Sequence, residues 1–115
     1  MRSLALLALT LAMQPAPAPA PSGPASRGEA YQAFLEARRL ESSGNAAAAI
    51  AAFERALTLD ESPAILTELA QLYARQDRPD DARKAAERAL ARDPEWADAH
   101  WMLGMLSVPD RKSVV

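Results

Sequence analysis

Residues 49–60 read AIAAFERALTLD, and residues 82–93 read ARKAAERALARD. The two stretches align at an offset of 33 residues and share the Glu-Arg-Ala-Leu run, the first alanine and the final aspartate. Self-similarity at such a period is typical of proteins built from stacked helical repeats. The repeat therefore predicts the architecture, whereas a repeat array alone does not identify its ligand.

The flanking residues resemble the tetratricopeptide repeat, a helix pair of about 34 residues. The family pattern runs large–x2–Leu–Gly–x2–Tyr in the first helix, Ala–x3–Phe in the second, and then Pro. The first unit offers Ala33, Glu36, Ala37, Leu40, Ala49 and Phe53, with Glu61 where proline is usual. The second offers Leu66, Leu69, Ala70, Tyr73, Ala82, Ala86 and Pro94, and a partial third offers His100, Leu103, Gly104 and Ser107. The resemblance covers about two and a half units.

The predicted fold is all-α, a short right-handed stack of antiparallel helix pairs, or tetratricopeptide-like α-solenoid. Abundant alanine favours helix. Alanines recur where neighbouring helices would have to approach closely, at Ala37, Ala49, Ala56, Ala70, Ala82 and Ala89. Turn and capping signals divide the chain at Gly44-Asn45, Ser62-Pro63, Asp77-Arg78-Pro79 and Asp93-Pro94. The expected helices are 29–43, 46–59, 63–76, 79–91 and 95–107.

The chain divides into four predicted segments: 1–14, 15–27, 28–108 and 109–115. The first has a basic start at Arg2 and an apolar run from Leu4 to Met13, shorter than the ~20 residues of a membrane span. It is interpreted as a signal peptide or a weak N-terminal anchor. The second is a Pro/Ala-rich disordered linker, the third the repeat domain, and the last a flexible tail. The expected location is periplasmic or secreted, or alternatively anchored at the inner membrane.

Composition argues against several classes of function. The absence of cysteine excludes disulfides and thiolate metal sites, and the single histidine, His100, has no visible partner ligands. The 13 basic and 15 acidic residues are interspersed, without the basic stripe of a nucleic-acid binder. No phosphate-binding glycine loop or nucleophile signature is present. We therefore expect no enzyme, no cofactor, no metal and no nucleic acid.

The resemblance implies that the first helix of each unit lines a concave groove for a peptide or a helix. The carboxylate-clamp activity of some family members is not implied, because only Arg38 is basic among the aligned positions. An alternative is that Tyr31 and Phe34 merely pack at the end of the array. The candidate partner-binding residues are Tyr31, Phe34, Arg38, Glu41, Thr67, Gln71, Arg75, Trp101 and Met105.

The last predicted helix is apolar over most of its circumference, so Trp101 and Met105 are expected to remain exposed. This end of the array would then join a partner or a second copy of the chain, unless the helix rotates to hide the face. The predicted function is a non-catalytic protein–protein interaction scaffold of an exported bacterial protein. The alternative is a membrane-anchored assembly factor that docks to an envelope complex, with the membrane involved only if the N-terminal segment is uncleaved.

Overall fold

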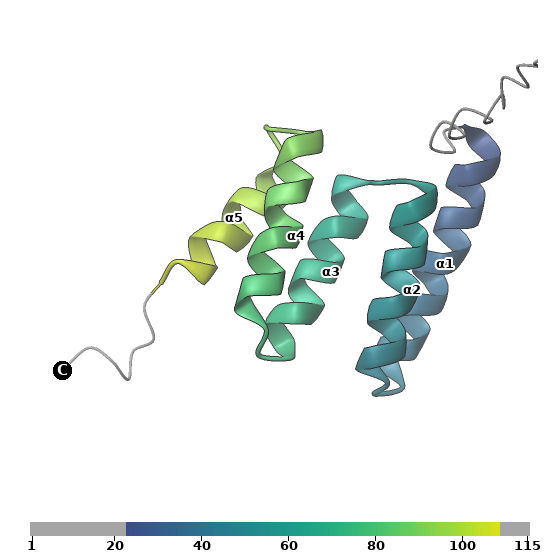
Figure 1. Ribbon diagram of the computed structural model, residues 1–115, viewed down its shortest axis with the longest axis horizontal. Coiled ribbons are helices and arrows are strands. Elements are labelled where there is room, and N and C mark those ends of the chain that lie inside the picture. The colour runs from purple at the N-terminus through teal and green to yellow at the C-terminus, as the bar shows by residue number, and fades with distance from the viewer. Residues whose placement is uncertain (1–22, 109–115) are drawn as a thin grey trace, which may run out of the picture.

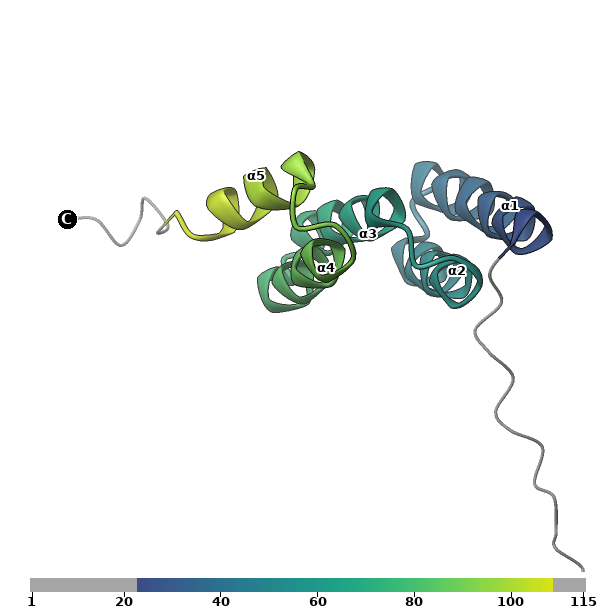
Figure 2. The same ribbon diagram turned by 90° about the horizontal axis from the view of Figure 1, so that it is seen from above.

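A computed structural model describes residues 23–108, and this segment forms a row of five helices (Figure 1). Seen from above, α1, α3 and α5 make up one layer and α2 and α4 the other (Figure 2). Helix α1 packs on α2, α3 packs on α4, and α5 contacts both α3 and α4. The all-α stack of helix pairs is confirmed, while its handedness stays a prediction. The helix bounds are α1 Pro24–Ser42, α2 Ala46–Leu59, α3 Pro63–Arg75, α4 Pro79–Arg92 and α5 Ala97–Leu106.

The turn signals divide the first four helices as predicted. Gly44 has a φ of 83°, a conformation that favours glycine, and the Asn45 side chain caps α2 by accepting a hydrogen bond from the Ala48 amide at 3.2 Å. Pro63 and Pro79 stand in the first turn of α3 and α4, where a missing N–H costs nothing. Ser62 precedes α3 as expected, although its side chain makes no capping hydrogen bond.

Helix α1 begins at Pro24, five residues earlier than predicted, so residues 24–27 belong to a helix and not to the linker. Proline suits the first turn because its fixed φ is already helical. The Arg27 amide and the Ser26 hydroxyl both donate to the carbonyl of Gly23, at 3.0 and 2.9 Å. The predicted segments 1–14 and 109–115, and the linker up to residue 22, lie outside the described residues.

The start of α5 was also predicted wrongly. A helix was expected to start at residue 95, directly after the signal Asp93-Pro94, but α5 starts only at Ala97. The Asp93 carboxylate accepts a hydrogen bond from the Glu95 amide at 3.0 Å, and the Asp93 carbonyl accepts one from Trp96 at 3.1 Å. These bonds form a local turn, an alternative that aspartate often offers to helix.

Alanines form the contacts between the helices. Each of the predicted close-approach positions is fully buried: Ala37, Ala49, Ala56, Ala70, Ala82 and Ala89. Small side chains there let helix axes approach closely. The gaps between them are filled by the largest fully buried side chains, which are Phe53, Leu66, Leu69 and Leu72. One continuous core thus runs through both complete helix pairs and reaches Met102 of α5.

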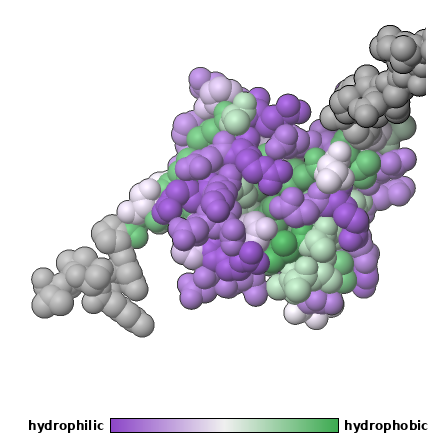
Figure 3. Space-filling view, viewed as in Figure 1, coloured by the Kyte–Doolittle hydropathy of each residue, from purple (hydrophilic) through white to green (hydrophobic). Residues whose placement is uncertain are grey.

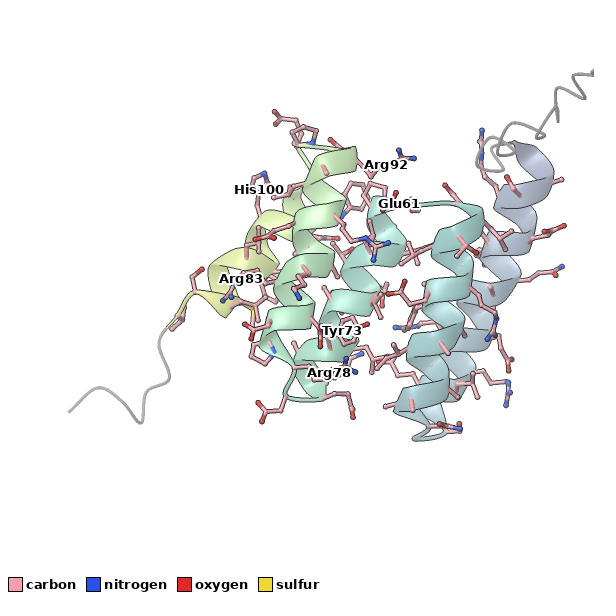
Figure 4. The ribbon with its side chains drawn as sticks, viewed as in Figure 1. Glu61, Tyr73, Arg78, Arg83, Arg92 and His100 are labelled. Atoms are coloured by element: carbon pink, nitrogen blue, oxygen red, sulfur yellow. The ribbon has the colours of Figure 1, made fainter. Side chains whose placement is uncertain are left out.

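Charged side chains of α4 form ion pairs and a hydrogen bond with residues of the first unit. Arg88 lies 3.3 Å from the Glu61 carboxylate and 3.7 Å from that of Glu54, and Arg92 donates to the Glu61 carbonyl at 3.3 Å. Glu61, in the proline position of the family pattern, is therefore held by the next unit (Figure 4).

At the other end of α3, the Arg78 guanidinium lies 4.6 Å from the ring centroid of Tyr73, the residue at the tyrosine position of the family pattern. Figure 4 shows the two side chains beside each other. Partial burial is the main cause that raises the pKa of the Tyr73 hydroxyl above its usual value. The ring therefore stays neutral at physiological pH, as its half-buried position against the core requires.

Candidate protein-binding groove

The layer of α1, α3 and α5 contains a cavity of about 350 Å³, which we call the groove. It lies where the N-terminal turns of α1 and α3 meet the α2–α3 connection, with one residue from α5. Its lining combines apolar, hydroxyl and charged side chains: Arg27, Ala30, Tyr31, Phe34, Asp60, Ser62, Ala64, Ile65, Thr67, Glu68 and Asp98. A concave site of mixed apolar and polar lining is the usual form of a ligand site in proteins.

An aromatic pair forms one wall of the groove. Tyr31 and Phe34 lie on one face of α1 because they are three residues apart, and their ring centroids are stacked at 6.2 Å. The Phe34 ring also meets the buried Phe53 ring edge-on at 6.0 Å, which anchors it to the core. Tyr31 is 59% exposed. Phe34 therefore packs on the core and also lines the groove, while Tyr31 presents a ring to solvent.

The charged candidates pair with one another across the two units. Arg38 of α1 donates to the Glu68 carboxylate of α3 at 2.8 Å and lies 3.7 Å from Glu41. Glu41 in turn pairs with Arg75 of α3. Exposed pairs of this kind each stabilise a fold by only ~0.2–1 kcal/mol. Arg38, Glu41 and Arg75 are thus close together, and their charges already have partners within the protein.

Two further candidates on α3 differ in their access to solvent. Thr67 lines the groove but is only 3% exposed, and its hydroxyl bonds to the carbonyls of Pro63 and Ala64, at 3.1 and 3.0 Å. It shapes the groove floor without a free hydroxyl. Gln71 lies one turn further along α3, is half-buried and does not line the cavity.

Helix α5 presents a separate apolar surface. Ala99 and Met102 are buried against the core, whereas Trp101 is 61% and Met105 53% exposed. The predicted exposure of Trp101 and Met105 is confirmed, and Val108 beyond the helix is exposed as well. Neither of the two candidates lines the groove. Of the nine candidate residues, three line the groove: Tyr31, Phe34 and Thr67. Four others lie on α1 and α3 outside its lining, namely Arg38, Glu41, Gln71 and Arg75, and Trp101 and Met105 belong to α5.

Sequence reasoning missed several groove residues. Arg27 was assigned to the linker, although its spacing of four residues from Tyr31 places both on one helix face. Asp60 and Ser62 belong to a connection and therefore carry no helical periodicity. Asp98 stands in the first turn of α5 and reaches the cavity through the packing of α5 on α3, a long-range contact that no local signal indicates.

The face formed by α2 and α4 contrasts with the groove. In the space-filling view it is mainly hydrophilic over α4, with an apolar strip along α2 (Figure 3).

His100 is exposed, and its Nε2 atom lies 2.7 Å from the Pro94 carbonyl. Within residues 23–108, no three histidine, aspartate or glutamate side chains gather as potential metal ligands. None of the helices in this range is long and apolar enough to cross a membrane.

Residues 40–106, more than half of the chain, match the family model of the tetratricopeptide repeat. The match starts in the last turn of α1. The earlier part of α1 lies outside the match, and its packing on α2 shows that it belongs to the same helix pair. The chain shows no significant match to a curated protein. The family consists typically of non-catalytic modules that bind protein partners. The match and the helix pairs together show that this chain belongs to the tetratricopeptide-repeat family.

Proposed function

We propose that this protein is a non-catalytic interaction scaffold whose groove binds a short peptide or a helix of a partner protein. One observation carries the proposal: an aromatic wall with an exposed Tyr31 ring stands over a cavity of about 350 Å³. An exposed aromatic side chain beside a concave site is a typical anchor for a partner, because it buries a large area at little entropic cost. The family's general role in protein binding supports the same function.

The groove is already formed without a ligand. Phe34 packs edge-on against Phe53, and the ion pairs Arg38–Glu68 and Glu41–Arg75 connect α1 with α3. A site that is already formed loses less free energy to ordering when a ligand binds. These ion pairs therefore act as supports of the groove, and Tyr31 is its main contact residue.

Peptides selected from a random library against the purified chain test this proposal. We expect Tyr31→Ala to weaken their binding about tenfold or more, because truncating an aromatic anchor removes most of its contact area. Tyr31 is largely exposed, so the melting temperature should change little. Lys84→Ala, an exposed change on α4, is the matched control and should leave the affinity unchanged. Equal affinities for wild type and Tyr31→Ala would contradict the groove as the binding site.

Helix α5 offers a second contact surface. Trp101, Met105 and Val108 are all more than half exposed, and neighbouring exposed apolar side chains mark sites of protein association. We propose that this surface, here called the α5 surface, joins a partner protein or a second copy of the chain. It is distinct from the groove, because neither Trp101 nor Met105 lines the cavity.

Sedimentation over a range of concentrations tests self-association through the α5 surface. The wild-type chain should show a concentration-dependent rise in mass, and Trp101→Ala should shift that rise to at least tenfold higher concentration, since a buried tryptophan is a typical hot spot. Leu35→Ala, which removes an exposed apolar side chain from α1, serves as the control. A wild type that stays monomeric at every concentration, with partner binding unaltered in Trp101→Ala, would rule out a role for this surface.

We further propose that the protein is exported, to the periplasm or beyond. The basic start, the apolar run from Leu4 to Met13 and the proline-rich stretch after it support this location. A membrane-anchored assembly factor is the alternative, and it requires the apolar run to remain attached. The mass of the mature chain distinguishes the two, because cleavage removes the run and anchoring retains it.

A further inference from the structure

Building on the proposed function, we propose that the groove binds a peptide that carries a lysine or an arginine. The cationic group lies near the carboxylates of Asp60 and Asp98, and an apolar side chain of the same peptide lies against Tyr31. The inference concerns the chemical class of the ligand and rests on the charges and aromatic rings that line one cavity.

The balance of charge in the groove is negative. Four charged residues line the cavity, and three of them are acidic: Asp60, Glu68 and Asp98. The Glu68 carboxylate is already bound by Arg38 at 2.8 Å. Asp60 and Asp98 form no ion pair with any residue of the described range 23–108. Arg27 contributes one opposing positive charge, so two unpaired carboxylates outnumber it.

The two unpaired carboxylates come from different parts of the chain. Asp60 caps the C-terminus of α2 with its backbone, and Asp98 stands in the first turn of α5. A first-turn acid stabilises its own helix through the helix dipole, and that role needs no hydrogen-bond partner. Both carboxylates therefore keep free acceptors, and both residues line the groove. Charges attract a ligand more strongly in a concave site with apolar walls than on an open surface.

The aromatic wall favours lysine and arginine over a small cation. Their long aliphatic stems pack on apolar surface while the charged end stays near carboxylates. The exposed Tyr31 ring can also attract a cation through its face. The net charge of the whole chain, -2, adds a weak long-range attraction for a basic partner.

Titration of the isotope-labelled full chain with three short peptides tests the inference by NMR. The peptides are acetyl-Gly-Ala-Leu-Lys-Ala-Gly-amide and its counterparts with glutamate or glutamine in place of lysine. At low salt the lysine peptide should shift the amide signals of the groove and bind about tenfold tighter than the glutamate peptide, with the glutamine peptide between them. The preference should decrease as salt is added, because salt screens exposed charges.

Two variants assign the preference to the carboxylates. Asp98→Asn and Asp60→Asn should each reduce the affinity for the lysine peptide about threefold and leave that for the glutamine peptide unchanged. Glu87→Gln removes the same charge from an exposed position of α4 and should have no effect. Because Asp60 and Asp98 lie on different elements, a folding defect in one variant leaves the other as a test.

The outcomes separate the ligand class from the groove itself. All three peptides could shift the amide signals of the groove without a preference for lysine, or with a preference for glutamate. Either result would overturn the basic ligand and leave the groove as a binding site. A lysine-peptide affinity that is unchanged in both aspartate variants would overturn the inference as well. If none of the peptides shifts a groove signal at millimolar concentration, both the ligand class and the proposed groove function are wrong.

Discussion

Phe53→Ala is expected to lower the free energy of unfolding by about 3–5 kcal/mol. Phe53 is fully buried, is among the largest buried side chains in the described range, and meets the Phe34 ring at 6.0 Å. Its removal leaves a cavity between α1 and α2 that the surrounding alanines are too short to fill. At roughly 0.05–0.15 kcal/mol per residue, a domain of this size has only about 4–13 kcal/mol to lose.

The urea midpoint, followed by helical circular dichroism, measures this loss. Leu35→Ala is the matched control because Leu35 lies on α1 but is 48% exposed, and its truncation should change stability by less than ~0.5 kcal/mol. A Phe53→Ala variant that unfolds at the wild-type midpoint would show that the contact between the first two helices is assigned wrongly.

Ala89→Leu is expected to destabilise the fold by about 1–3 kcal/mol. Ala89 is fully buried on α4 and stands at the same place in its unit as the fully buried Ala56 on α2. A larger side chain there would push α4 away from its neighbours, since contact side chains set the distance between helix axes. Ala56→Leu should have an effect of similar size, because the two units repeat the same contact.

Ala91→Leu gives the control for this second prediction. Ala91 is exposed on the same helix, and leucine is nearly as good a helix former as alanine, so the midpoint should stay close to that of the wild type. If Ala89→Leu and Ala91→Leu lowered the free energy of unfolding by equal and substantial amounts, α4 would be generally intolerant of leucine. The close helix contact at Ala89 would then not be the cause.

The sequence predicts the helices well where the turn and capping residues themselves set the helix boundary. Gly44-Asn45 and Pro79 set helix boundaries through their own backbone preferences, so α2 and the start of α4 are as predicted. The repeat itself identifies the pairs and their buried alanines. The sequence fails where one residue permits two structures: Asp93 can start a helix or bond to the next backbone amides, and in this chain it does the latter.

The groove was predictable only in part. Tyr31 and Phe34 are found by their spacing on one helix, but the pairing of Arg38 with Glu68 joins residues 30 positions apart. Likewise, Asp98 reaches the cavity only through the packing of α5 on α3. Contacts between residues so far apart in the sequence depend on how the units stack, and no local sequence pattern encodes that stacking. The ion pairs of Arg38, Glu41 and Arg75 are therefore absent from the sequence prediction, which gives these three residues only as candidate partner contacts.

Site-specific photo-crosslinking in the protein's own cells tests the central claim most directly. A photoreactive amino acid is placed at Tyr31 in the groove, or at Lys84, an exposed position of α4, as the control. The account predicts that the Tyr31 position crosslinks to a distinct protein and the Lys84 position does not. The crosslink should disappear when the groove also carries Phe34→Ala, in a variant that remains helical by circular dichroism. Crosslinks to the same protein from Lys84 alone, with none from Tyr31, would contradict the groove as the binding surface.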